Sequence, residues 1–334
     1  MGNNLNKFSK SMKKLLLIAL ALNFVACSND DSTENTTSAI APAKKETFNP
    51  NPTPQDYLNA KHPDFMASIE SLKKESPLSG STAKTQAFVS TYVPDTAFRN
   101  AIVNMGAAQD ANPGDQWVEV DTTRGGLYIA GLGITDLTGI NGFTGLKQLI
   151  VSGNNLSTIN VSGLANLEWI ECQQNQLTTL NLSANTKLQQ VWCHLNQLTS
   201  LVLPSSPTLF GVWCYSNQLA TLNLNNNTGI TQLFIQGNQL TSFNFAPFVN
   251  IEQMNVSNNK WVTLNFNSNP KIKSIWSFSI TTLTDLSIKN GANTLVTIQD
   301  FTGNTKRPPI HVDASFLPNA NTAWPNRGAS TYVL

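Results

Sequence analysis

Apolar and polar positions recur every 21 residues from Leu146 onward. The first and fourth residues of each unit are apolar, as is the sixth in all but the last unit, and the residues between them are mostly polar, which is typical of a short strand with one buried face. One such unit cannot bury its apolar face alone, so neighbouring units must stack. The pattern therefore predicts one strand per unit in a parallel sheet, with strands about 4.8 Å apart. The units begin at Leu146, Leu167, Leu188, Leu209, Ile230, Ile251 and Ile272.

The ninth residue of these units is asparagine in all but the last. A side-chain amide has both a donor and an acceptor, and it can satisfy backbone groups where the chain turns away from a strand. We therefore expect a structural ladder rather than a catalytic row. Its members are Asn154, Asn175, Asn196, Asn217, Asn238 and Asn259. A unit of 21 residues leaves no room for a long helix, so we expect extended or 3₁₀ segments on the return side.

The unit LEWIECQQNQLTTLNLSANTK, which begins at Leu167, contains the pattern LxxLxLxxNxL and resembles the leucine-rich repeat. The resemblance implies a solenoid with a concave parallel sheet. An earlier unit, residues 124–145, resembles an internalin-type repeat, although Leu132 takes the place of asparagine. The last unit also departs from this pattern, because Ile280 replaces the asparagine at its ninth position. We assign residues 124–293 to the repeats.

The segments beside the repeats are expected to be caps. Pro94 and Asp95 predict the start of a short helix with Phe98, Ile102 and Met105 on its inner face. Residues 86–123 resemble the N-terminal cap of flavobacterial leucine-rich-repeat lipoproteins, and residues 294–334 resemble their C-terminal cap. Caps shield the open ends of a stacked sheet.

The first 26 residues read as a signal peptide. Lysines precede an apolar run, residues 15–25, that is too short to span a bilayer. Phe24-Val25-Ala26-Cys27 resembles a bacterial lipobox, although Phe24 replaces the usual leucine. The resemblance implies lipidation of Cys27 and an anchor in the outer membrane. The alternative is an ordinary cleaved signal.

Residues 27–85 are expected to be a flexible linker between the anchor and the repeats. Residues 28–31 resemble the export signal of Bacteroidetes-type surface lipoproteins, which implies exposure at the cell surface. Residues 49–54 predict a Pro-rich spacer. A short helix is expected between Tyr57 and Lys74.

Charge is scarce in this chain. Asp, Glu, Lys and Arg make up 12 % of the residues, against about 25 % in ordinary soluble domains, and the net charge is +1. A nucleic-acid binder needs a basic patch, so this class is disfavoured. Residues 146–292 hold only ten charged residues. The composition therefore favours a neutral partner.

Three cysteines, Cys172, Cys193 and Cys214, occupy the sixth position of consecutive units. Adjacent strands are close enough for a disulfide. However, three is an odd number, and neighbouring units place valine or isoleucine in the same position, so we expect core packing. Zinc is disfavoured because the spacing of a cysteine or Cys/His site is absent from the sequence.

The third, fifth and seventh strand positions are expected to face outward on the concave side. We predict a solvent-facing aromatic patch there, because such patches mark binding surfaces. The candidate ligand-binding residues are Trp169, Glu171, Trp192, His194, Trp213, Tyr215, Phe234, Trp276 and Phe278. Gly211 should leave a dip beside Trp192 and Trp213. The alternative is that the rings only stabilise the sheet through cross-strand pairing.

The candidate chemistry points to binding. Glu171 and His194 are the only groups predicted at these concave positions that could carry charge. A glycoside hydrolase needs two carboxylates, and His194 has no evident nucleophile to activate. We therefore expect a non-enzymatic surface lipoprotein without cofactor or metal that binds a protein or peptide. The alternatives are binding of a neutral glycan, with Gln173, Gln190, Gln232, Gln236 and Gln253 beside the rings, and a hydrolase with an unrecognised site in the caps.

Overall fold

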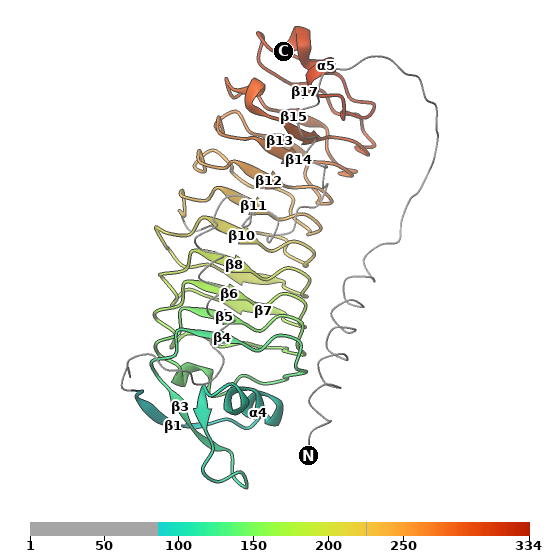
Figure 1. The fold of residues 1–334 in the computed structure, drawn as a ribbon. Helices are drawn as coiled ribbons and strands as arrows, with labels where there is room; N and C mark the ends of the chain where they lie inside the picture. The colour runs from blue at the N-terminus through green and yellow to red at the C-terminus, as the bar shows by residue number, and fades with distance from the viewer. Residues whose placement is uncertain (1–85, 225) are drawn as a thin grey trace, which may run out of the picture. The chain divides into compact units, whose positions relative to one another are not determined.

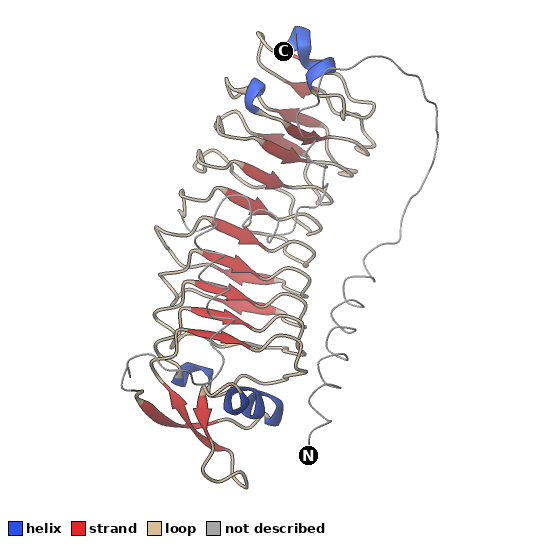
Figure 2. Cartoon of the chain, viewed as in Figure 1, coloured by secondary structure: helices blue, strands red, loops and turns tan. Residues whose placement is uncertain are grey.

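The computed structural model describes residues 86–224 and 226–334. They form a solenoid whose strands stack in one column, with the helical segments near its two ends (Figures 1 and 2). The predicted signal peptide, the lipidation site Cys27 and the linker with its expected helix lie outside the described residues.

The concave side of the solenoid is a sheet of nine parallel strands within the described part of the chain. Every strand is three residues long, and each pairs in register with the next turn, so that Val212 lies opposite Val191 and Leu233. The leucine-rich-repeat solenoid predicted from the 21-residue period is confirmed. In spatial order the strands are β4 (Gly126–Tyr128), β5 (Gln148–Ile150), β6 (Trp169–Glu171), β8 (Gln190–Trp192), β10 (Gly211–Trp213), β11 (Gln232–Phe234), β12 (Gln253–Asn255), β14 (Ser274–Trp276) and β16 (Ile298–Asp300).

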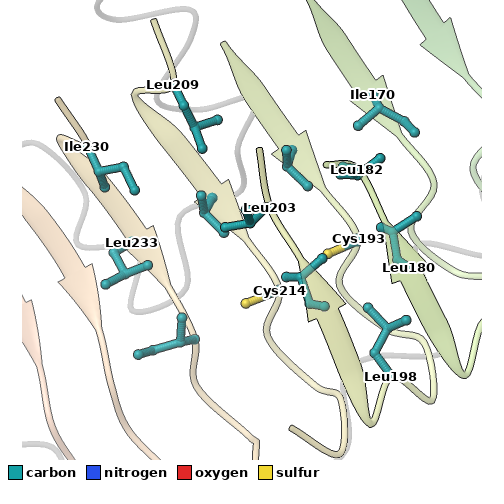
Figure 3. Close-up of a cluster of buried hydrophobic side chains, with 14 of the residues drawn as sticks. Ile170, Leu180, Leu182, Cys193, Leu198, Leu203, Leu209, Cys214, Ile230 and Leu233 are labelled. Carbon is teal, nitrogen blue, oxygen red and sulfur yellow. The ribbon is translucent and has the colours of Figure 1, made fainter. Parts of the chain in front are cut away.

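The core lies between this sheet and the return side of each turn. The fourth-position residues from Leu149 to Ile275 are fully buried, as the period predicts. Cys172, Cys193 and Cys214 are free thiols in the same core, which excludes a disulfide between them. Burial raises the pKa of Cys172 and of Cys214 to about 12, so both remain protonated. Figure 3 shows Cys193 and Cys214 among leucine side chains from neighbouring turns.

The return side contains short extended and 3₁₀ segments, as a repeat of this length requires. Two small parallel sheets form there, of order β7-β9 and β13-β15-β17-β18. These strands are β7 (Thr179–Asn181), β9 (Ser200–Val202), β13 (Thr263–Asn265), β15 (Asp285–Ser287), β17 (Ile310–His311) and β18 (Tyr332–Val333). The 3₁₀ segments η1 (Ile140–Gly142) and η2 (Asn293–Leu295) also lie between concave strands in the sequence.

The ninth-position asparagines form the predicted ladder, and each joins two turns. The Asn217 side-chain oxygen accepts the Leu198 N–H at 2.9 Å. Its amide nitrogen donates to the carbonyl oxygens of Cys193 at 3.1 Å and Cys214 at 3.0 Å. The equivalent bonds recur in the ladder from Asn154 to Asn259. The ladder therefore satisfies backbone groups that the turn buries.

The concave sheet continues beyond the predicted repeats. Strand β16 pairs with β14 although it lies in the segment that we expected to be the C-terminal cap. Asn304 extends the ladder, because its side-chain oxygen accepts the Ile280 N–H at 2.9 Å and its nitrogen donates to Ser277 and Phe301. Asn304 follows Ile280 by 24 residues, so a search at a period of 21 does not find it.

A second row of buried asparagines supports the return side, and the sequence analysis did not identify it. The Asn185 amide nitrogen donates to the carbonyls of Val161 and Leu164 in the preceding turn. Asn269 makes the equivalent bonds to Phe245 and Phe248, and Asn227 donates to Pro204 in the preceding turn and to Leu224 in its own turn. In the turns that carry Asn185, Asn227 and Asn269, side-chain amides therefore support the return side as well as the strand side.

The N-terminal end is covered by an antiparallel sheet and a helix. Strands β1 (Phe88–Tyr92), β3 (Trp117–Asp121) and β2 (Ala108–Gln109) form the sheet in that order. Helix α4 (Thr96–Asn104) begins after Asp95, whose carboxylate accepts the Phe98 N–H, and it buries Phe98 and Ile102 as predicted. The other Asp95 oxygen accepts the Thr135 N–H at 2.9 Å, which joins this helix to the first repeat.

The C-terminal end of the described chain closes around Trp324. This ring contacts Phe316, Phe301 and Tyr332, and its nitrogen donates to the Val296 carbonyl. The neighbouring helical segments are η3 (Leu317–Asn319) and α5 (Ala320–Ala323). None of the helices in residues 86–334 is both long enough and apolar enough to cross a membrane.

Replacing Asn217 by alanine should lower the stability of the solenoid. The substitution leaves the Leu198 N–H without its acceptor, and an unsatisfied buried group costs about 1–3 kcal/mol. The carbonyls of Cys193 and Cys214 each lose one of two side-chain donors, because they also accept from Asn196 and Asn238. We expect Asn217→Ala to reduce the free energy of unfolding by about 1–3 kcal/mol in urea titrations. Gln218→Ala is the matched control, because Gln218 is the exposed neighbour, and its unfolding curve should match the wild type. Equal stability of the two variants would contradict a stabilising role of the ladder.

Candidate functional site

The concave aromatic residues form a hydrophobic cluster that is separate from the solenoid core. We call it the concave cluster. It comprises Trp169, Trp192, Trp213, Phe234 and Trp276, with Tyr215 and Phe278 packed against it. The five main members lie on β6, β8, β10, β11 and β14. The strand register places the predicted aromatic residues together on one face of the sheet.

The rings of the concave cluster contact one another along the sheet. Ring centroids are 5.2 Å apart for Trp169 and Trp192, and 5.5 Å apart for Trp192 and Trp213, with interplanar angles of 57° and 62°. Trp213 and Phe234 are stacked, with centroids 5.8 Å apart and an angle of 6°. Trp276 reaches Phe234 at 6.3 Å across the strand that carries Asn255. The row is therefore continuous from β6 to β14.

Gly211 allows the Trp213 ring to lie back over its own strand. A Cβ atom at position 211 would approach two Trp213 ring atoms to 2.3 and 2.6 Å, closer than any side chain could tolerate. The predicted dip beside Trp192 and Trp213 is therefore wrong, because the Trp213 ring fills it. Glycine is required here for the close approach of an aromatic ring rather than for an open subsite.

The aromatic residues share one face, but the prediction that this patch is exposed to solvent is wrong. The five main rings are between 0 and 4 % exposed, and Tyr215 and Phe278 are partly buried. The rings tilt against one another and Trp213 lies over Gly211, so they share much of their surface. Sequence periodicity places these residues on the concave side, but it does not show how much of each ring remains open.

Polar groups without hydrogen-bond partners lie beside the rings. Among the described residues, both amide atoms of Gln232, the indole nitrogens of Trp213 and Trp276, and the amide nitrogens of Gln190 and Asn255 are buried and unpaired. The Gln190 oxygen accepts the Trp192 indole N–H at 3.0 Å. An unsatisfied buried polar group costs about 1–3 kcal/mol, so several on one face need an explanation. They offer donors and acceptors to a ligand.

One of these polar residues is absent from the sequence-predicted alternatives. Asn255 carries a buried unpaired side-chain nitrogen, whereas the neighbouring glutamines were already candidates for glycan binding. Asn255 occupies the same strand position as Trp213 and Phe234, and this position is the signal that could have identified it.

His194 lies against Tyr215 and remains uncharged near neutral pH. The two rings are stacked with centroids 4.2 Å apart. Burial lowers the pKa of His194 to about 3, because desolvation penalises the imidazolium form. Burial also raises the pKa of Tyr215 to about 12. The prediction that His194 could carry charge at the concave face is therefore wrong, and its neutral ring contributes aromatic surface.

The concave face carries two carboxylates that are far apart. Glu171 is partly buried, and one of its oxygens accepts the Gln173 amide N–H at 3.2 Å. Asp300, on β16, lies in register with Trp276 and was missed because β16 was expected to belong to the cap. Six strand spacings separate Glu171 from Asp300, which is about 29 Å. Paired glycosidase carboxylates lie about 5–9.5 Å apart, so these two cannot act on one glycosidic bond.

The rims of the sheet carry most of the ion pairs of the repeats. Lys147 and Glu168 are 3.2 Å apart on adjacent turns, and Lys273 and Glu252 are 2.8 Å apart. Groups of three or more candidate metal ligands are absent from residues 86–224 and 226–334. The middle of the concave face is thus lined mainly by aromatic and amide side chains, and the ion pairs lie at its edges.

Comparisons with known proteins support the fold. No protein-family profile matches the sequence, and no curated protein matches it significantly. The solved structure of internalin InlF from Listeria monocytogenes is similar, with 18 % sequence identity, a TM-score of 0.52, and coverage of 72 % of this chain and 75 % of that one.

Two further solved structures resemble the chain. Internalin C2 of Listeria monocytogenes has 16 % identity and a TM-score of 0.48, with coverage of 65 % of this chain and 97 % of that one. A leucine-rich-repeat protein of Leptospira interrogans has 16 % identity and a TM-score of 0.47, with coverage of 60 % and 57 %. At such identities the similarity shows the fold alone: the chain is an internalin-like leucine-rich-repeat solenoid.

Gly211→Ala should disrupt the concave cluster without unfolding the core. The new Cβ displaces the Trp213 ring and breaks its stacking on Phe234. We expect loss of near-ultraviolet circular dichroism from the rings and a fall of about 1–3 kcal/mol in unfolding free energy. Gly125→Ala is the control, because its Cβ would meet nothing within 4 Å. If both variants had the wild-type spectrum, the described packing of Trp213 over Gly211 would be incorrect.

Proposed function

We propose that this protein is a non-catalytic binding protein whose concave cluster binds a protein or peptide partner. The observation that carries the proposal is the combination of a continuous apolar row with buried unpaired amide and indole groups on the same face. Unpaired buried polar groups lower the stability of a folded protein. A ligand that forms hydrogen bonds with them removes this cost, which favours binding. Stacked-repeat folds use extended concave surfaces for binding, and internalin-like leucine-rich repeats are often protein-interaction domains.

The chemistry of the concave face favours binding over catalysis. Its two carboxylates are about 29 Å apart along the sheet, and a neutral His194 stacked on Tyr215 has no nucleophile to activate. A hydrolase site in the caps remains the rival class. Among the described residues of the caps, the Arg99–Asp110 pair at 3.8 Å joins two elements. His311 lies beside Asp285 and Ser287, but its two ring nitrogens contact the Leu334 carbonyl and Asp285, and the Ser287 hydroxyl donates to Asn267, so the imidazole is not positioned to activate that hydroxyl.

Glycan binding is the second candidate function, and the unpaired amides favour it. Glutamine side chains suit hydroxyl groups as well as they suit peptide groups. A sugar also needs an open aromatic face on which to stack, whereas the rings here are tilted and closely packed. A peptide can place apolar side chains between ring edges and pair its backbone with the amides, so we favour a peptide or protein ligand.

The proposed location is the outer membrane, with a lipid on Cys27 and the repeats at the cell surface. The support is the sequence alone: a basic segment, a short apolar run and small residues before Cys27. The low charge of the repeats is consistent with a neutral partner outside the cell.

Replacing Trp192 and Trp213 by alanine together should weaken partner binding. Aromatic hot-spot residues contribute about 2 kcal/mol or more to the binding free energy, so we expect the affinity to fall about 30-fold or more. The partner is one captured by the tagged full chain. The measurement is calorimetric titration of that partner. Trp117→Ala is the control, because Trp117 is exposed on the N-terminal cap and should leave the affinity unchanged.

Gln232→Leu separates loss of binding from loss of folding. Both amide atoms of Gln232 are unpaired within the described chain, so leucine should maintain or raise the thermal unfolding temperature while it removes the donor and acceptor offered to the ligand. Unchanged affinity in this variant and in the double tryptophan variant would reject the concave site. Retention in a polysaccharide affinity gel that is lost in both variants would instead establish the glycan function.

Cys27→Ser should release the protein from the membrane. A serine has no thiol to receive the lipid, and the described repeats contain no membrane-spanning helix. We expect the wild type in the outer-membrane fraction and the variant mainly in the soluble fraction after cell fractionation. Cys193→Ser is the matched control, because this thiol is buried in the core. An unchanged membrane fraction for Cys27→Ser would remove the anchor proposal.

A further inference from the structure

The concave cluster needs a cover that the described residues do not supply. Its rings are almost completely buried although they stand on the outer face of a single sheet. Within residues 86–224 and 226–334, the partly buried apolar residues packed against it are Tyr215 and Phe278, which belong to the same face. Contact between neighbouring rings buries their edges, but water is kept from the opposite side only by a further layer of atoms.

The chain that precedes the described residues is long enough to reach this face. The first described strand, β1, starts at Phe88 in the N-terminal cap. Eleven residues, 75–85, can span up to about 36 Å. The distance from β4 to β10 is four strand spacings, about 19 Å, so a segment that ends at residue 74 can lie on the rings of Trp169 and Trp213.

The sequence before residue 75 has the composition that this face requires. Asp64 is a residue type that is favoured at the N-cap of a helix. Phe65, Ile69 and Leu72 follow it at the spacing that places them on one face of a helix. An amphipathic helix in an apolar groove is recognised through anchors at this spacing. Residues 57–74 contain three lysines and two acidic residues, and their slight positive charge complements Glu171 on the concave face.

We propose that residues 57–74 of this chain bind the concave cluster as an internal ligand, which an external partner must displace. The internal ligand occupies the site in the free protein and shields its apolar rings from water and from unspecific contacts. The inference deepens the proposed function and rests on it for the displacement step. The internal contact itself is tested without any external partner.

The test compares the full chain with a variant in which Phe65, Ile69 and Leu72 are all replaced by serine. Hydroxyl-radical footprinting with mass spectrometry measures the oxidation of individual tryptophans. In the wild type we expect Trp192, Trp213 and Trp276 to be protected. In the triple variant their oxidation should rise several-fold, because the anchors no longer hold the segment on the rings.

Two controls make the result specific. The double variant Ala67→Ser plus Glu70→Gln changes the opposite face of the expected helix and should retain the wild-type protection. Trp261 is buried in the solenoid core and should stay protected in all variants, which shows that the repeats remain folded.

Three outcomes would overturn the proposal. The concave tryptophans could be oxidised in the wild type as readily as Trp117, or they could stay protected in the triple variant. Protection in the wild type could also disappear on dilution, which would identify a second copy of the chain as the cover. None of these results depends on capture of a partner, so they are distinguishable from failure of the proposed function.

Discussion

The side-chain amide of the ninth-position asparagine is the interaction on which the solenoid depends. It accepts one N–H that the turn would otherwise bury without a partner, and it donates to two carbonyls, one in each of two successive turns. The amide allows the chain to leave each three-residue strand sharply and return after 21 residues. Since no charge is needed for this task, the repeats can be built almost without charged residues. The second row, which includes Asn185 and Asn227, does the same on the return side.

The parallel register that follows determines the chemistry of the concave face. Strands about 4.8 Å apart bring the fifth-position rings of β8, β10 and β11 beside one another, and Trp169, at the third position of β6, contacts Trp192. Indole rings at that spacing cannot all present flat faces, so Trp169, Trp192 and Trp213 tilt and share surface. The same crowding leaves indole and amide groups buried without partners. Most of the surface of this face is apolar, but it carries many hydrogen-bond donors and acceptors. This combination suits selective recognition rather than general adhesion.

The sequence predicts the parts of this molecule that repeat. The period alone places Ile170 and Val212 in the core, identifies the asparagine ladder and assigns the tryptophans to the concave side. It fails where the period changes: Asn304 and β16 continue the sheet after a turn of 24 residues. It also fails for properties that depend on distant neighbours. The burial of Trp213, its position over Gly211 and the low pKa of His194 arise from packing that strand periodicity does not encode.

The asparagine ladder also governs how such a protein can change in length during evolution. From Asn175 to Asn259, each amide bonds to groups at fixed separations in the preceding turn, 19 residues back for the donor and 24 for one acceptor. Duplication of one whole unit preserves every bond, whereas a shorter insertion within the strand and its exit turn breaks several at once. The concave surface can therefore lengthen only in steps of one strand spacing. Each step adds one row of outward residues, so recognition can diversify by copying and altering single turns.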